Sequence, residues 1–306
     1  MVTEEKPDIT VIILTFNEEL HIRRCVTNAF LFAKQVFIID SYSTDKTVEI
    51  AESLGAIVLK NKWENNHAKQ VNWALENCPF TTDWILRLDA DEFLTEKLIK
   101  EIKAKIPDLP ADISGVVLPR QIYFLGQRIK RGTGVVKILR LFKNKKARCE
   151  DRLMDEHMVL LEGGAVEFSN FMIDNNLSNL GWWTAKHNGY SLREAIDLLN
   201  QKHSFLKTES DKVENKLTRQ ANKKRKAKSL YSKMPLFLRA FLYFIYRYFI
   251  MGGFLDGRPG LIWHFLQGFW YRFLVDAKIY EIQKLARTKN KSIVEVLEDD
   301  YGFKIN

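Results

Sequence analysis

Residues 84–91 carry the sequence WILRLDAD, in which an apolar run ends at two carboxylates, Asp89 and Asp91. Such a run is typical of a strand buried in a sheet, and the acidic pair comes where that strand opens onto solvent. Carboxylate oxygens on a short turn suit Mg²⁺ or Mn²⁺, which stabilise a departing diphosphate. Because Asp-x-Asp is also common in surface turns, the rest of the sequence has to distinguish a metal site from a turn.

The chain before this strand alternates between predicted strands and helices. Apolar runs predict strands at residues 10–14, 35–39, 56–59 and 84–88. Helices are expected up to about residue 33, from Thr44 or Asp45 to Leu54, and over residues 66–77. This alternation predicts an α/β fold with a doubly wound sheet, whose ligands bind beyond the carboxyl ends of the strands.

Polar segments follow three of these strands, so they should share that edge of the sheet. They read TFNE at 15–18, IDSYSTDKT at 39–47 and LDADE at 88–92, and in order and spacing they resemble family 2 glycosyltransferases. The resemblance covers about residues 8–165. It implies a GT-A fold, Rossmann-like with a doubly wound mixed sheet, that binds a nucleotide-diphosphate sugar and a Mn²⁺ or Mg²⁺ cofactor.

The resemblance also implies roles for single residues. Those assigned to the nucleotide sugar are Thr15, Glu18, Asp40, Lys69 and Asp89. Thr15 and Glu18 should border the nucleoside, and Asp40 should accept a hydrogen bond from uracil. Asp91 should bind the metal directly, with Asp89 near the metal and the ribose. Asp40 in a local Asx-turn and Lys69 as an ordinary exposed lysine remain the alternatives.

An inverting transfer needs a base that deprotonates the acceptor hydroxyl. Residues 152–158 read RLMDEHM and lie where the family's base usually falls. We predict Glu156 as the base and keep Asp155 as its rival, because the order Asp-Glu-His departs from the family's usual Glu-Asp. His157 is then a contact for the metal or the diphosphate, or else a structural histidine.

Residues 123–134 combine aromatic, basic and glycine residues. This composition predicts a mobile basic loop that touches the acceptor, with a solvated hairpin rim as the alternative.

Composition divides the chain in two. The formal net charge is +9, yet residues 201–250 alone hold 13 Lys and Arg against 3 Asp and Glu. A basic cluster at 223–228 precedes an aromatic, amphipathic segment with no uninterrupted apolar stretch of spanning length. We therefore predict a catalytic domain over 1–170 and a helical region over 171–306 that lies on an anionic membrane surface. Helices packed on the catalytic domain are the alternative.

The C-terminal sequence GWWTAKHNGY, residues 181–190, resembles bacterial enzymes of lipopolysaccharide core or capsule synthesis. It implies a lipopolysaccharide or other lipid-linked glycan acceptor, with UDP-glucose or UDP-galactose as donor. The tryptophans would stack on a sugar, lie at the membrane boundary, or anchor the helical region to the sheet. Three widely spaced cysteines, Cys25, Cys78 and Cys149, fit core positions in a reducing cytoplasm. The expected location is therefore the cytoplasmic face of a bacterial plasma membrane.

The sequence leaves alternatives to this function open. Within the transferases, the alternative is a polyprenyl-phosphate sugar synthase. A basic protein that binds membranes or nucleic acid without catalysis is the alternative from another class, but the aromatic segment lacks the polar residues of a nucleic-acid groove. A phosphoaspartate phosphatase would need Thr or Val where Phe93 stands. Nucleic acid is therefore not an expected partner.

Overall fold

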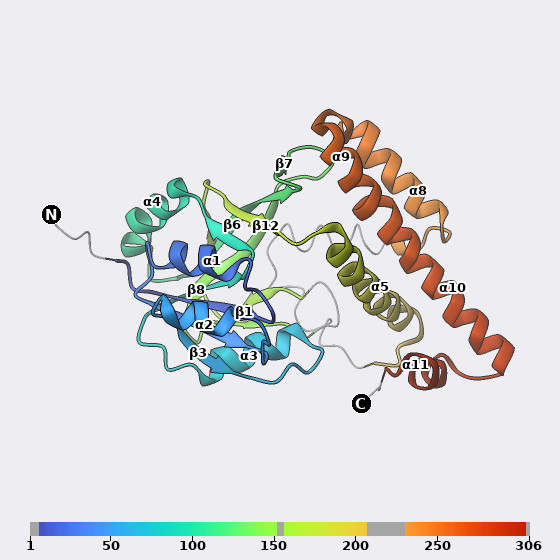
Figure 1. Cartoon of the computed structure of the whole chain (residues 1–306), viewed down its shortest axis with the longest axis horizontal. Coiled ribbons are helices and arrows are strands. Elements are labelled where there is room, and N and C mark those ends of the chain that lie inside the picture. Colours follow the sequence, from blue (N-terminus) through green and yellow to red (C-terminus); the bar gives the residue numbers. More distant parts are fainter. Residues whose placement is uncertain (1–5, 152–155, 207–229, 304–306) are drawn as a thin grey trace. The chain divides into compact units, whose positions relative to one another are not determined.

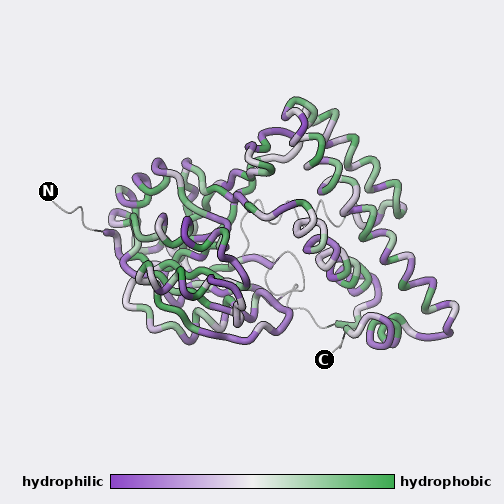
Figure 2. Tube along the Cα trace, in the orientation of Figure 1, coloured by the Kyte–Doolittle hydropathy of each residue, from purple (hydrophilic) through white to green (hydrophobic). Residues whose placement is uncertain are grey.

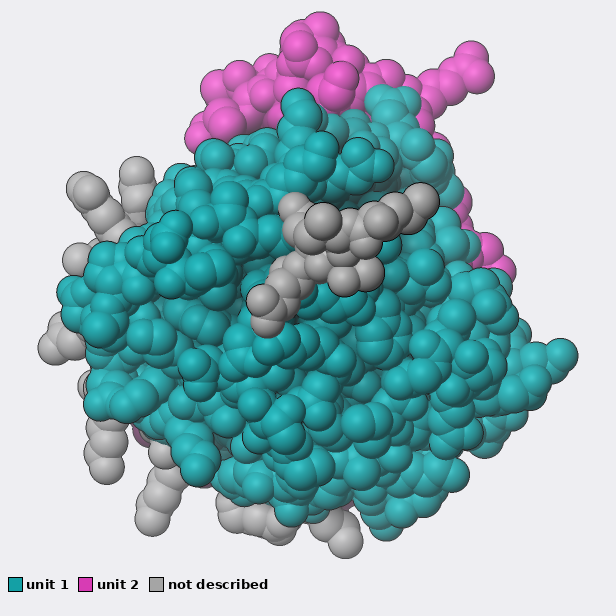
Figure 3. Space-filling view, turned by 90° about the vertical axis from the view of Figure 1, so that its left-hand side faces the viewer, with its two compact units in different colours: residues 1–129, 134–177, 210–223 teal, residues 130–133, 178–209, 224–306 magenta. Residues whose placement is uncertain are grey.

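The structure is a computed structural model that describes residues 6–151, 156–206 and 230–303 (Figure 1). The chain forms two compact units (Figure 3). Among the described residues, unit 1 comprises 6–129, 134–151 and 156–177, and unit 2 comprises 130–133, 178–206 and 230–303. The main division in the described chain falls after Leu177, whereas the sequence placed it after residue 170.

Unit 1 begins with the predicted alternation of strands and helices. Its first elements are β1 (Ile9–Thr15), α1 (Ile22–Ala29), β2 (Gln35–Asp40), α2 (Thr47–Ser53), β3 (Ile57–Lys60), α3 (His67–Asn77) and β4 (Trp84–Asp89). The remaining elements are β5 (Glu92–Leu94), α4 (Glu96–Lys105), η1 (Ile106–Asp108), β6 (Ile113–Phe124), β7 (Gln127–Ile129), β8 (Val136–Lys143), β9 (Ala147–Cys149), β10 (Met158–Leu160), β11 (Gly164–Glu167) and β12 (Met172–Asn175).

The main sheet is mixed. Its strand order is β3-β2-β1-β4-β8-β6-β12-β5, with β11 and β7 also paired to β6. The first four strands are parallel, and β8 runs antiparallel to both β4 and β6. The register pairs Thr15 with Asp40 and Leu14 with Asp89, so three predicted site residues stand at neighbouring strand ends. The predicted α/β fold with a doubly wound mixed sheet is confirmed.

Both faces of the sheet are covered, because alternate residues of a strand point to opposite faces. Ile9, Val11 and Ile13 of β1 pack in one core with the apolar sides of α1, α2 and α4. Ile12 packs in a second core with α3. The three cysteines are free and buried, as predicted for small core residues.

Two local predictions need correction. The N-cap of α2 is Lys46, which provides no side-chain cap, although Asp45 Oδ1 accepts a hydrogen bond from the N–H of Thr47. The predicted loop after residue 123 is instead a hairpin, in which β7 pairs with the end of β6. Gly55 follows the α2 segment with a positive φ of 88°, which a residue with a Cβ rarely adopts.

Unit 2 is helical in its described residues. Its elements are α5 (Leu180–His203), α8 (Leu238–Ile245), η3 (Tyr246–Ile250), η4 (Gly253–Asp256), α9 (Gly257–Trp263), η5 (His264–Trp270), α10 (Tyr271–Lys289) and α11 (Ile293–Tyr301). Trp182 and Trp183 lie inside α5. Trp183 is buried, stacks on His187 at a centroid distance of 3.5 Å and lies 6.1 Å from the Trp263 ring, so it belongs to the core of this unit.

None of the described helices by itself has the length and hydropathy of a membrane span. Leu238–Ile250 and Gly253–Lys289 meet those criteria together, as a pair bent by 67°.

Glu101 of α4 fixes the turn that leads into β12. Its carboxylate accepts hydrogen bonds from the backbone N–H groups of Ser169 and Asn170 and from Lys105. Burial alone would raise the pKa of Glu101, but these donors outweigh it and lower the pKa from 4.5 to about 2. β12 in turn pairs with β5, which begins directly after Asp91. Glu101 therefore supports the predicted site on the side of β12.

We expect Glu101→Gln to lower the free energy of unfolding at pH 7 by about 2–3 kcal/mol, because the amide cannot accept all these bonds. Since the folded-state pKa is below the unfolded value, this stabilisation is complete above about pH 4.5 and is lost as the pH falls toward 2. Urea denaturation at pH 7 and at pH 3 measures both effects. Glu52→Gln, an exposed glutamate of α2, is the control, and equal stability of the two variants would contradict the assignment.

Candidate active site

The loops that follow β1 and β2 are joined by hydrogen bonds. Asp40 Oδ1 accepts from the hydroxyl groups of Thr15 at 2.9 Å and Ser43 at 2.5 Å, and Asp40 Oδ2 accepts from the N–H of Ser43 at 2.8 Å. Asp40 is fully buried. The bond from the Ser43 N–H is local but spans three residues, so it is not the Asx-turn of the alternative prediction, which would close two residues on. Asn17, with a positive φ of 56°, accepts from the N–H of Thr44 and completes the connection.

Glu18 is held by a histidine that we did not single out from the sequence. The N–H of Leu177 donates to Nε2 of His21 at 2.8 Å, so the ring proton lies on Nδ1, which is 2.6 Å from Glu18 Oε2. The N–H of Glu18 also donates to the Thr47 hydroxyl. Glu18 therefore has a fixed position at the predicted nucleoside side of the edge.

Asp89 lies between two arginines. Arg87 Nη2 donates to its Oδ1 at 2.5 Å, and Arg140 Nη2 lies 3.0 Å from its Oδ2. The Arg140 guanidinium also donates to Glu92, at 2.7 Å. Arg120 lies 3.4 Å from Glu92 and extends this network of guanidinium and carboxylate groups.

The two carboxylates of this network have opposite pKa shifts. For Asp89, burial favours a higher pKa, but the charge of Arg87 and the contact with His67 outweigh it, so the pKa lies below its ordinary value. The pKa of Glu92 is raised well above its ordinary value, because burial and the nearby charge of Asp89 both oppose ionisation. Asp89 is thus the group that keeps a negative charge at the open end of β4.

Asp91 is held mainly through its backbone. Its carbonyl oxygen accepts from the N–H of Asn175 at 3.1 Å and from Arg24 at 3.2 Å. The side-chain amide of Asn176 donates to Oδ2 of Asp91 at 2.9 Å. Oδ1 of Asp91 accepts no hydrogen bond from the described residues, so it is the carboxylate oxygen of Asp91 that is best suited to bind a metal ion.

Glu156, the predicted base, lies beside His67, the first residue of α3. Its Oε1 is 3.2 Å from His67 Nδ1, a polar contact that is not aligned as a hydrogen bond. On the other side of the ring, Arg87 Nη2 is 2.6 Å from His67 Nε2. Because a guanidinium only donates, Nε2 accepts and the ring proton is on Nδ1, facing Glu156. One histidine therefore links the predicted base to Arg87 and, at 3.9 Å, to Asp89.

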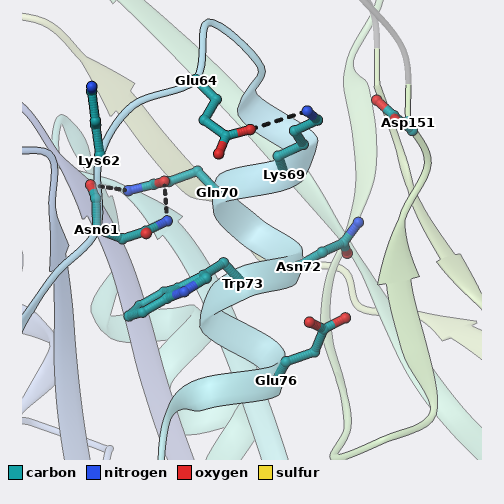
Figure 4. Close-up of a pocket in the computed structure, with 9 residues that line it drawn as sticks. All are labelled: Asn61, Lys62, Glu64, Lys69, Gln70, Asn72, Trp73, Glu76 and Asp151. Carbon is teal, nitrogen blue, oxygen red and sulfur yellow. Dashed lines mark hydrogen bonds and ion pairs between the residues drawn. The ribbon is translucent and has the colours of Figure 1, made fainter.

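Lys69 lies two residues after His67, on a different side of α3. Its ammonium group pairs with Glu64 at 3.0 Å (Figure 4). It lines a shallow pocket together with Asn61, Lys62, Glu64, Gln70, Asn72, Trp73, Glu76 and Asp151. The structure does not bring Lys69 together with the Asp89 cluster, and its predicted contact with the nucleotide stays a prediction.

The remaining predicted residues are His157 and Asp155. The backbone of His157 exchanges hydrogen bonds with Glu150, at 2.9 and 3.0 Å. Asp155 lies outside the described residues. Within the described ranges, no group of three His, Cys, Asp or Glu side chains is arranged to hold a metal. His157 as a metal contact therefore stays a prediction.

Sequence reasoning missed the three arginines and gave His67 no role. Arg87 was visible as the single charged residue in the apolar run 84–88. Arg140 is the extra residue at a bulge, since Val116 pairs with Leu141 and Val117 with Leu139. Bulges redirect side chains near active sites, but a single sequence does not reveal them.

Comparison with known proteins identifies the family. The model of the glycosyl transferase family 2 matches residues 10–159. An uncharacterised glycosyltransferase of Rickettsia typhi is 28% identical over 298 residues, covering 91% of this chain and 89% of that protein. The glycosyltransferase SunS of Bacillus subtilis is 33% identical over 104 residues, covering 33% of this chain and 23% of that protein.

A solved structure, glucosyl-3-phosphoglycerate synthase from Mycobacterium tuberculosis with Mn²⁺, UDP and glucosyl-3-phosphoglycerate, is 18% identical. The alignment covers 38% of this chain and 44% of the chain in that structure. Its TM-score is 0.32, which is too low to support a conclusion about this chain. The family match includes the three polar segments at 15–18, 39–47 and 88–92, and it also includes Glu156. With the relative that aligns along nearly the whole chain, it shows that this protein is a glycosyltransferase of family 2.

Proposed function

We propose that this glycosyltransferase transfers a sugar, with inversion, from UDP-glucose or UDP-galactose to a lipopolysaccharide or other lipid-linked glycan. The observation that carries the proposal is the contact chain from Glu156 through His67 to Asp89 and Arg87. It brings a carboxylate that suits a base to the strand end where the family motif places the donor. The sugar and the acceptor follow from the sequence resemblance alone.

In this proposal Glu156 removes the proton from the acceptor hydroxyl as that oxygen attacks the sugar. Its side chain is 20% exposed, so an acceptor has access to it. His67 lies against Oε1 of Glu156 through Nδ1, at 3.2 Å, which leaves Oε2 for the substrate.

The departing diphosphate needs positive charge. Mg²⁺ is commonly bound by one or two carboxylates together with substrate phosphates. Asp91 fits this requirement through Oδ1, whereas Asp89 is already held by Arg87 and Arg140. Asp91 would therefore be the main protein ligand, and a bound Mg²⁺ or Mn²⁺ would neutralise the charge on the diphosphate.

At the nucleoside side, Thr15 and Asp40 bind each other, and Glu18 binds His21. In this arrangement they hold the two loops together. A contact between Asp40 and a uracil ring would replace one of its present hydrogen bonds.

His67 should act as a positioning residue for Glu156. We expect His67→Ala to lower kcat about 10-fold or more with less change in KM for the donor, because Glu156 loses its oriented contact. His67→Asn, whose amide N–H replaces Nδ1–H, should recover part of kcat. Steady-state kinetics of both variants measure this split. A loss of thermal stability with an unchanged kcat in the folded fraction would show that His67 has only a structural role.

The proposed reaction is tested by offering the full-length protein a set of UDP-sugars and GDP-sugars with lipid-linked glycan acceptors. We expect acceptor-dependent release of UDP, fastest with UDP-glucose or UDP-galactose. Preferential release of GDP would contradict the proposed donor. Transfer to a polyprenyl phosphate in preference to a glycan would contradict the proposed acceptor.

A further inference from the structure

The segment formed by α8 and η3 has its charged side chains inside and its apolar side chains outside. Leu238, Phe241, Phe249 and Ile250 are between 50% and 72% exposed. With Leu242 and Tyr246, which are 42% and 48% exposed, they recur every three to four residues along the segment, as expected for one side of a helix. The two arginines of this segment, Arg239 and Arg247, are each only 2% exposed. This is the reverse of the distribution expected for a helix that faces water.

The buried arginines have specific partners within unit 2. Arg239 pairs with Asp276 of α10, which is itself fully buried and also accepts from the N–H of Phe237 at 2.7 Å. Arg247 Nε donates to the carbonyl of Gly132 at 3.0 Å, and its Nη1 donates to Gln267. Both charges of this segment therefore lie inside the helical unit, Arg239 against a carboxylate and Arg247 against neutral acceptors, and neither lies on the outer side of α8 and η3.

The next turn repeats the pattern. In η4, Phe254 and Leu255 are 47% and 58% exposed, whereas the adjacent Asp256 is 3% exposed. Asp256 Oδ2 accepts from the N–H groups of Lys130 and Arg131, both at 2.8 Å. Of the six Asp, Glu, Lys and Arg residues between 238 and 276, four are buried.

We define the apolar face as Leu238, Phe241, Phe249, Ile250, Phe254 and Leu255. Along the chain, Figure 2 shows mostly hydrophobic colouring over α8 and a more hydrophilic C-terminal half of α10. Soluble monomers rarely expose an apolar patch that runs over several turns, and such a patch marks a site for a partner or a membrane. The apolar face therefore needs an occupant.

We propose that the apolar face inserts into the interface of a lipid bilayer. A protein interface usually has an apolar centre with a polar rim. Charged side chains of a segment in contact with lipid usually face the protein interior and pair with one another, as Arg239 does with Asp276. The bent helix pair also meets the length and hydropathy criteria of a membrane segment, and its 67° bend suits a segment that enters one leaflet and returns. This proposal goes beyond the transferase reaction and does not depend on it.

The test is co-sedimentation of the full-length protein with vesicles of phosphatidylcholine alone and of phosphatidylcholine with phosphatidylglycerol. Phe249→Ser combined with Ile250→Ser should weaken binding to both vesicles at least about tenfold, because two large apolar side chains no longer leave water. Leu31→Ser combined with Ile57→Ser is the matched control. These side chains of unit 1 are 53% and 44% exposed and should change vesicle binding less than twofold.

Phe254→Ser combined with Leu255→Ser repeats the test at η4, so the proposal remains testable if one double variant folds poorly. Thermal melts identify the variants that keep the wild-type fold. Equal vesicle binding by the wild type and both folded double variants would overturn the proposal. So would a wild-type protein that binds neither vesicle and forms a dimer that Phe249→Ser with Ile250→Ser dissociates, because the apolar face would then join two copies of the chain. Stronger binding to the phosphatidylglycerol vesicles would support the predicted preference for an anionic surface.

Discussion

Glu156→Gln should lower kcat by about 10²–10⁴-fold, the usual contribution of a general base. The amide has nearly the same size as the carboxylate and can keep its contact with His67, so the donor should bind with little change. Rapid-mix and steady-state kinetics separate these effects, because loss of a group that acts in the transition state changes kcat more than the donor's binding constant.

Glu162→Gln is the matched control for this substitution, since Glu162 is an exposed glutamate a few residues further along the chain. It should keep wild-type turnover. Wild-type kcat in Glu156→Gln, together with a large loss in Asp155→Asn, would assign the base to Asp155 and contradict our assignment.

Asp91→Ala should abolish metal-dependent donor binding and lower turnover by at least about 100-fold, because the diphosphate loses its counter-charge. The fold should survive the change. The contacts of Asn175 and Arg24 are made to the Asp91 carbonyl, which alanine keeps. Isothermal titration with UDP in the presence and absence of Mn²⁺ measures the binding effect, and circular dichroism verifies the fold.

Asn176→Ala is the control for the hydrogen bond that Asp91→Ala also removes. It leaves the carboxylate in place, so it should keep metal-dependent binding within a few-fold. If Asn176→Ala lost activity as strongly as Asp91→Ala, the Asp91 side chain would act by supporting β12 and not by binding a metal.

The strands of unit 1 could be predicted because their signals are local. The runs at 10–14, 35–39 and 84–88 are apolar and mostly β-branched or leucine, and each ends at polar residues. The parallel register then brings Thr15, Asp40 and Asp89 to one edge with no further information. That part of the candidate site follows from the order of the elements.

The network around Asp89 could not be predicted in this way. Arg87, Arg120 and Arg140 come from three strands, and they meet only because β8 lies between β4 and β6 in the sheet. Which side chain of β8 faces the site depends on the bulge at Arg140. His67 looked like an ordinary first residue of a helix, and only its contacts with Arg87 and Glu156 indicate more.

In unit 2, the charges of the aromatic segment were visible but their burial was not. From the sequence, Arg239 and Arg247 interrupt an apolar stretch, and an amphipathic helix in water would place them toward the solvent. Their partners lie far along the chain, at Asp276 for Arg239 and at Gly132 and Gln267 for Arg247. The amphipathic character was therefore predicted, whereas the inward direction of the charges needed the structure.

The central claim is that the edge of the sheet beyond β1, β2 and β4 binds a nucleoside diphosphate with a divalent metal. Calorimetric titration of the full-length protein with UDP and with GDP, each with and without Mn²⁺, tests it most directly. We expect binding of UDP that requires Mn²⁺ and is lost in Asp91→Ala. Failure of a well-folded wild-type protein to bind either nucleotide in the presence of Mn²⁺ would contradict it.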